Sequence, residues 1–108
     1  MLAIVFLLSL MMNCVVETKL PDSSDLVGTS WKSEENGTVQ IIMFITTSLC
    51  TMSYINPGMS TPDISEATYE FLGDEITISL AGAQLHGTIS GKTMALGNGS
   101  EKLTFTRQ

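Results

Sequence analysis

The side chains best suited to chemistry in this sequence are one histidine, His86, and two cysteines, Cys14 and Cys50. Apolar and polar residues alternate from Leu85 to Phe105, and this pattern points His86 away from the apolar face. Cys50 is expected on the apolar face of another strand, as a buried and inert thiol. These positions disfavour a Cys–His catalytic pair, and one histidine with one free cysteine cannot complete a zinc site.

Acidic residues recur between Asp63 and Glu75, and Glu66 and Glu70 share one face of an expected strand. Such a pair could hold calcium or act as an acid and a base, although exposed strand faces often carry carboxylates that have no such role. The sequence has no phosphate-binding loop, serine nucleophile elbow or dinucleotide fingerprint. We therefore expect a protein that is not an enzyme and that uses neither a cofactor nor a metal.

The N-terminal segment Met1–Met12 is almost wholly apolar, broken only by Ser9. It is shorter than the roughly 20 residues of a membrane-spanning helix, but it fits the apolar core of a secretory signal peptide. Cys14 follows at once, and the stretch Leu10–Cys14 resembles a bacterial lipobox, in which the cysteine is lipidated. The alternatives are an ordinary signal peptide with a chance cysteine, or an N-terminal helix adjacent to a membrane.

Composition and charge indicate how the rest of the chain is organised and which partners it disfavours. Residues 1–14 are expected to be the signal peptide, residues 15–25 a polar tether, and residues 26–108 one small domain. The formal net charge of −6 argues against nucleic acids and anionic lipid surfaces as partners. Two cysteines give no disulfide framework unless Cys14 and Cys50 pair.

Three hairpins are expected in the C-terminal half, and the strand registers that they imply agree with one another. Two-residue turns at Gly73-Asp74, Gly91-Lys92 and Gly99-Ser100 each align apolar residues with apolar residues. A turn at Asn98-Gly99 would instead set Leu96 opposite a glutamate, so the apolar pattern rejects it.

The N-terminal half of the domain is predicted from two further turns. A turn at Asn36-Gly37 sets Trp31 opposite Ile42, and a turn at residues 46–48 aligns Phe44 with Cys50. In the longest connection, residues 56–65, Thr61-Pro62-Asp63 could cap one short helical turn. The connection would lie across a barrel mouth or form a plain surface crossover.

The expected fold is all-β: a small antiparallel up-and-down meander of about eight strands that closes into a barrel. An open meander or a sandwich is the alternative. The strands are expected near residues 29–34, 39–45, 49–55, 66–72, 75–80, 84–90, 93–96 and 102–107.

Two stretches resemble a known family. Val27–Lys32 resembles the Gly-x-Trp entry of lipocalin-like proteins, and residues 87–94 with residues 103–108 look like the small lipocalin-like lipoproteins of Bacteroidetes. The resemblance implies a secreted, calycin-like barrel, and with the lipobox it implies a lipid anchor to the outer membrane or cell envelope of a Gram-negative bacterium. It implies no particular ligand.

The inward face predicted by these registers is bulky, so we expect a filled barrel. A continuous internal cavity above about 300 Å³, the low end for ligand pockets, would contradict this expectation. The expected interior residues are Trp31, Ile42, Phe44, Met52, Tyr54, Tyr69, Phe71, Ile76, Ile78, Ile89, Met94, Leu96, Leu103 and Phe105.

The same registers leave a contiguous apolar stripe on the outside of the second and third strands. We call it the outer stripe; it comprises Val39, Ile41, Met43, Ile45 and Leu49. A partner protein, a second copy or the segment Val15–Leu20 could cover it, unless the register is off by one and the stripe is core. The predicted function is a non-catalytic binding module for a partner protein or a small apolar ligand, with an inhibitor or a structural envelope component as the alternative.

Overall fold

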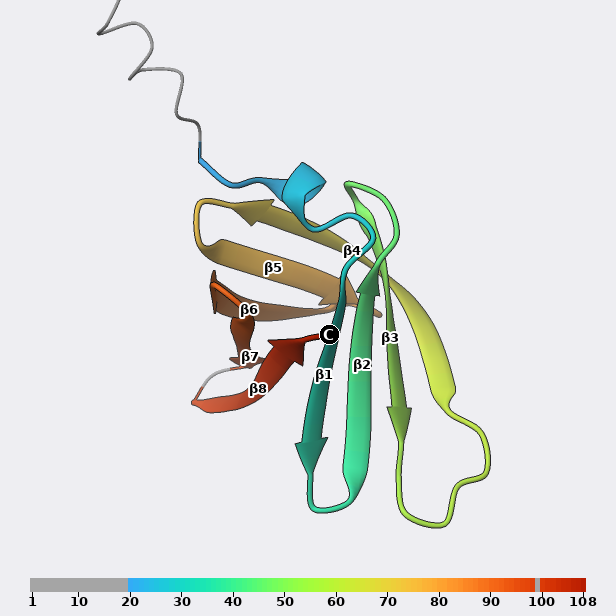
Figure 1. Ribbon diagram of the computed structural model, residues 1–108. Helices are drawn as coiled ribbons and strands as arrows, with labels where there is room; N and C mark the ends of the chain where they lie inside the picture. Colours follow the sequence, from blue (N-terminus) through green and yellow to red (C-terminus); the bar gives the residue numbers. More distant parts are fainter. Residues whose placement is uncertain (1–19, 99) are drawn as a thin grey trace, which may run out of the picture.

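The computed structural model describes residues 20–98 and 100–108, so the expected signal peptide and Cys14 lie outside the described residues. Eight antiparallel strands follow one another around a closed barrel, which confirms the predicted fold class (Figure 1). The strands are β1 (Ser30–Glu35), β2 (Thr38–Phe44), β3 (Leu49–Ile55), β4 (Asp63–Leu72), β5 (Glu75–Leu80), β6 (Ala83–Ser90), β7 (Thr93–Asn98) and β8 (Glu101–Arg107).

The hairpin registers are those predicted from the turns. Trp31 pairs with Ile42 in the β1–β2 hairpin, and Met94 pairs with Phe105 in the β7–β8 hairpin. Asn36 and Gly37 both adopt positive φ angles, 54° and 82°, as a type I′ turn requires. Because the register is fixed, the side chains of the outer stripe lie on the outside of the barrel. The alternative, in which the register is shifted by one residue and the stripe is core, is wrong.

The connection before β4 is shorter than predicted. β4 begins at Asp63, so the helical turn that the sequence allowed at this point does not form. Asp63 and Ile64 pair with Tyr54 and Ser53 of β3. The main-chain amides and carbonyls of this segment therefore form hydrogen bonds in the β-ladder rather than within a helical turn.

One hydrophobic cluster, to which every strand contributes, occupies the interior of the barrel. The ring of Tyr69 meets the ring of Phe44 edge-on, with centroids 4.7 Å apart. The buried apolar residues are Leu26, Trp31, Ile42, Phe44, Cys50, Ala67, Tyr69, Phe71, Ile76, Ile78, Met94, Leu96 and Phe105, and Met52, Leu80, Leu85, Ile89 and Leu103 pack against them half-buried.

The segment before β1 is bound to the barrel, although the sequence assigned residues 15–25 to a tether. A one-turn 3₁₀ helix, η1 (Ser23–Asp25), carries a capping box formed by Asp22 and Asp25. Ser23 accepts a hydrogen bond at Oγ from the Phe71 amide at 3.2 Å, and the Gly73 amide donates to the Pro21 carbonyl at 2.8 Å. The folded unit therefore includes residues from Pro21 onward.

Two glycines allow the strands around β7 to approach closely. A Cβ atom on Gly87 would overlap the main chain of Ala95, and one on Gly97 would overlap the main chain of Glu101. Neither glycine has a positive φ angle, so the requirement is for space rather than for backbone freedom.

The barrel closes between β1 and β8 over a short distance. Trp31 pairs with Arg107 and Lys32 with Thr106, and the Gln108 amide donates to the Ser30 carbonyl at 2.8 Å. Beyond Lys32 the two strands diverge, and the β7–β8 hairpin turns away from β1 in Figure 1.

Candidate functional site

The two ends of the barrel differ in how they are closed. Leu26, which follows η1, is 4% exposed at the end nearest that helix. The opposite end opens into a cavity of about 710 Å³, which we call the cup. The residues lining the cup are Glu35, Gln40, Met52, Leu85, Leu96, Gly97, Asn98, Ser100, Glu101, Lys102, Leu103 and Phe105.

The cup combines an apolar interior with a polar rim. Leu96 and Phe105 are buried and form its floor, while Met52, Leu85 and Leu103 are half-buried and form its walls. Glu35, Glu101 and Lys102 are exposed and supply charges of both signs at the rim. About half of the lining is polar, so the cup shares with small-molecule sites an apolar inner part and polar groups at the entrance, but it is more polar than most of them.

The cup is open to solvent at its mouth, so it is not the continuous internal cavity above about 300 Å³ that would contradict the prediction of a filled barrel. β1, β2 and β3 reach farther toward the open mouth than β5 to β8 do (Figure 1). The predicted interior position of Tyr54 is wrong, because this residue is 41% exposed.

Tyr54 and Asp63 form a polar pair near the open mouth. The Tyr54 hydroxyl donates to Oδ2 of Asp63 at 3.1 Å, and the two residues are cross-strand partners in β3 and β4. This hydrogen bond, together with the negative charge of Asp63, raises the pKa of Tyr54. The phenol therefore stays protonated and remains a hydrogen-bond donor at neutral pH.

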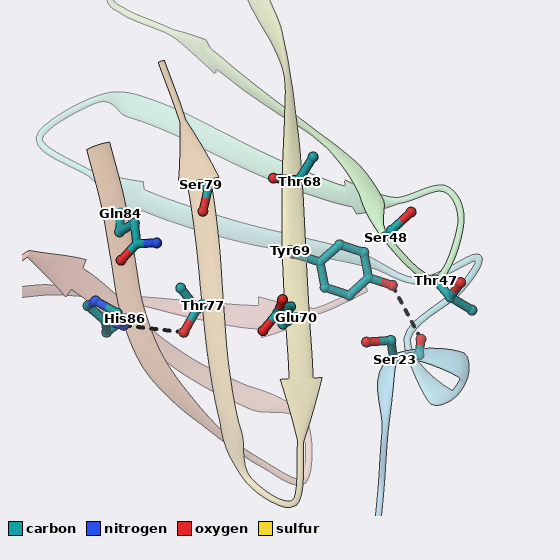
Figure 2. Close-up of a pocket in the computed structure, with 10 residues that line it drawn as sticks. All are labelled: Ser23, Thr47, Ser48, Thr68, Tyr69, Glu70, Thr77, Ser79, Gln84 and His86. Atoms are coloured by element: carbon teal, nitrogen blue, oxygen red, sulfur yellow. Dashed lines mark hydrogen bonds between the residues drawn. The ribbon is translucent and has the colours of Figure 1, made fainter. Parts of the chain in front are cut away.

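A second hollow, of about 500 Å³, lies over the outer face of β4, β5 and β6 and contains His86 (Figure 2). Hydroxyl and amide side chains dominate it, and Thr77 Oγ1 lies 3.2 Å from Nδ1 of His86. Its aromatic residue, Tyr69, is 3% exposed and its hydroxyl points toward Ser23, so no ring face is offered to a ligand. We regard this hollow as a polar surface groove.

The other side chains that could take part in catalysis or metal binding do not come together in one site. Cys50 is fully buried, and burial raises the pKa of its thiol to about 11. His86, Glu66 and Glu70 are exposed on the outside of the barrel, away from Cys50. Within residues 20–98 and 100–108, no cluster of three or more potential metal-binding side chains occurs.

The outer stripe is exposed in part. Met43, Ile45 and Leu49 are 47%, 49% and 38% exposed, whereas Val39 and Ile41 are half-buried. Ile64 on β4 extends the apolar surface, since it is 61% exposed and pairs with Ser53, the partner of Ile41.

Sequence reasoning placed several cup residues correctly on the inward face but missed the cup itself. The signal that could have revealed it is Gln40, two residues before the inward-facing Ile42 and paired with Ser33. Two polar residues at paired inward positions indicate that this level of the barrel is not close-packed with apolar side chains.

Comparison of the chain with family models, curated proteins and solved structures gives no match. Among the described residues, no helix has the length and hydropathy to span a membrane. The fold and the cup define the chain as a small closed up-and-down barrel with one plugged end and one open end.

Proposed function

We propose that this chain is a non-catalytic binding module that takes a small apolar ligand into the cup. The observation that carries the proposal is the combination of a 710 Å³ volume with an apolar floor and a charged rim. A ligand with an apolar body and a polar end would bury its body against Leu96 and Phe105. Its polar end would remain near Glu35, Glu101 and Lys102.

The size of the cup supports a ligand rather than trapped water alone. Ligand pockets range from about 300 to 1,000 Å³, and the mouths of β-barrels are frequent places for them. Apolar walls gain little from holding water, because water needs two to four polar partners in a buried site. Occupancy by an apolar group would remove the half-buried faces of Met52, Leu85 and Leu103 from solvent.

Titration with N-phenyl-1-naphthylamine, a neutral fluorophore that brightens in apolar surroundings, tests the proposal. We expect saturable binding at one site, weakened about tenfold or more by Leu85→Lys or Leu103→Lys, because a charge in the cup must be desolvated. Leu72→Lys is the matched control, since Leu72 is 63% exposed on the outer face.

Urea unfolding of each variant checks that the barrel is intact before binding is compared. Failure of the fluorophore to bind the wild-type chain, or equal binding by the two cup variants and the control, would rule out the cup as the ligand site.

A second candidate function is docking of a partner protein on the outer stripe. The exposed faces of Met43, Ile45, Leu49 and Ile64 favour it, because contiguous exposed apolar side chains mark interaction sites. An inhibitor or a structural envelope component would use this surface rather than the cup. Loss of a co-purifying protein, or of self-association, in an Ile41→Thr and Met43→Thr double variant would favour this function.

The proposed setting is the cell envelope, with the chain lipid-anchored through Cys14. The apolar run before Cys14 and the lipobox-like Leu10–Cys14 support this setting. The resemblance to small lipocalin-like lipoproteins of Bacteroidetes agrees with it.

A further inference from the structure

The closure between β1 and β8 leaves a gap beside the cup, which we call the seam. The ladder between these strands contains Trp31 with Arg107 and Lys32 with Thr106, and it ends there. The next main-chain partners in this register would be Glu34 and Thr104. Within the part of the chain that the structure describes, these two residues are not paired in the β1–β8 ladder.

The main-chain groups of Glu34 and Thr104 face the seam. The Ser30 carbonyl accepts from Gln108 of the C-terminal segment, so every second residue along β1, including Lys32 and Glu34, turns its amide and carbonyl toward β8. The Arg107 amide donates to the Lys92 carbonyl on the β7 side, so Thr106 and Thr104 turn theirs toward β1. Two unpaired strand edges therefore oppose each other.

The seam is hollowed on both sides of the barrel wall. On the outside a hollow of about 320 Å³ is lined by residues of both edges, among them Glu34 and Thr104. On the inside the cup is lined by Glu35 from one edge and by Glu101 to Leu103 from the other. An extended chain lying in the seam would have one set of alternate side chains outside and the other set inside the cup.

We propose that the seam is a docking site for an extended peptide strand of a partner protein, which would complete the ladder between β1 and β8. This interaction goes beyond the proposed binding of a small ligand. Unpaired strand edges recognise main-chain amides and carbonyls, and a single extended strand supplies both along each of its edges.

Charge and burial inside the cup define the side chains of this strand. Lys32 already pairs with Glu34 at 3.0 Å. At the rim, Glu35 of β1 and Glu101 of β8 occupy inward-facing positions, whereas Lys102 occupies an outward-facing position of β8. Deeper in the cup the surface is apolar, formed by Leu103 and Phe105. The strand that fits has an apolar inward side chain and a lysine or arginine two positions away, toward the mouth.

The probe is a palindromic heptapeptide, acetyl-Thr-Lys-Thr-Leu-Thr-Lys-Thr-amide, whose sequence reads the same in both directions. Amide hydrogen exchange followed by NMR reports whether the seam is filled. We expect the Glu34 and Thr104 amides to exchange at least about tenfold more slowly with the peptide at saturation, while amides already paired in the hairpins change little.

Two peptide controls separate main-chain pairing from other modes of binding. The same heptapeptide methylated at alternate main-chain nitrogens loses one hydrogen-bonding edge, so it cannot pair with both strands and should protect at most one of the two amides. The heptapeptide with glutamate in place of both lysines should bind more weakly, since it would meet Glu35 and Glu101 with like charge.

Two matched pairs of protein variants test the same point. Glu34→Pro and Thr104→Pro each remove a seam-facing amide without removing one that pairs in a hairpin, and each should weaken peptide binding about three- to tenfold. Glu34→Ala and Thr104→Ala keep the amide and should bind within about twofold of the wild-type chain.

The two proline variants lie on different strands, so the test stands if one of them fails to fold. Both should bind N-phenyl-1-naphthylamine as the wild-type chain does, which separates this proposal from the ligand function of the cup. Absence of protection at Glu34 and Thr104, or peptide binding that neither methylation nor proline weakens, would overturn the proposal.

Discussion

Trp31 and Thr29 are joined by a hydrogen bond in which the indole Nε1 donates to Oγ1 of Thr29 at 2.9 Å. Thr29 Oγ1 in turn donates, at 2.6 Å, to the carbonyl of Leu26, the buried residue that plugs this end of the barrel. The largest buried side chain is thus tied to the segment that enters β1 through one hydroxyl group.

Thr29→Val is expected to lower the free energy of unfolding by about 1–3 kcal/mol, because it leaves the buried indole amine without an acceptor. Urea unfolding measures the change. Thr29→Ser, which keeps the hydroxyl, should stay close to wild type. Equal losses in the two variants would show that the methyl group matters rather than the hydrogen bond.

Ile42 and Met43 are neighbours on β2 that face opposite sides of the barrel wall. Ile42→Ala should cost about 2–5 kcal/mol, since the side chain is 1% exposed, whereas Met43→Ala should change the free energy of unfolding by less than about 0.5 kcal/mol. Thermal and urea unfolding of the pair measure both values. A core-sized loss at Met43 would contradict the outward orientation of the outer stripe.

Gly87→Ala is expected to destabilise the barrel by about 2–3 kcal/mol, because the added methyl group would overlap the main chain of Ala95. Thr88→Ala, one residue later on the exposed face of β6, is the control and should be nearly neutral. Similar stability in the two variants would mean that β6 and β7 separate at little cost.

Cys50 makes the barrel sensitive to alkali. Its pKa is about 11 in the folded chain against 9.0 for an unperturbed thiol, so its contribution to stability is complete below pH 9 and is lost as the pH rises toward 11. At pH 10.5 the loss attributable to this thiol is about 2 kcal/mol relative to pH 8.

The measurement compares urea unfolding of the Cys14→Ser chain with that of Cys14→Ser, Cys50→Ala at the two pH values. The variant without Cys50 should lose less stability, since all other titrating groups are shared. A thiol reagent such as 5,5′-dithiobis(2-nitrobenzoate) should react with Cys50 only after unfolding. Rapid reaction in the folded state would contradict the buried thiol.

Cys14→Ser is expected to release the native protein from the membrane fraction, because the lipid anchor is attached at that sulfur in the proposed maturation. Fractionation with immunoblotting measures the distribution, and mass spectrometry of the wild-type chain should find a diacylglycerol adduct. Persistent membrane association together with an unmodified Cys14 would show that the lipobox assignment is wrong.

The sequence predicted the fold well because the turns and the apolar alternation constrain each other. Asn36-Gly37 and the three glycine-containing turns leave one register in which apolar residues meet, and the strands adopt it. The cup was not predicted, because it depends on how far each strand reaches toward the open mouth, which the local pattern of each strand does not determine. β4 is three residues longer at its start than expected, and this extension is set by pairing with β3 rather than by local propensity.

The seam could not be predicted either. Strand pairing between the two ends of a meander depends on the tilt and twist accumulated over all the strands between them, and no local pattern encodes that sum. Pro21–Asp25 shows a similar limit. Its polar composition is typical of a tether, whereas its contacts are with Phe71 and Gly73, which lie far away in the sequence.

The short closure also has a consequence for how the chain folds. In the described part of the chain, seven of the eight strand pairings join consecutive strands, and only β1 with β8 joins distant ones, with Lys32 and Thr106 separated by 74 positions. Hairpins form within about 1–10 μs, so the loop-closure entropy of the final pairing is expected to set the folding rate. During synthesis the hairpins can form one after another, but the curved sheet keeps its apolar inner surface exposed to other nascent chains until residues 106–108 emerge from the ribosome.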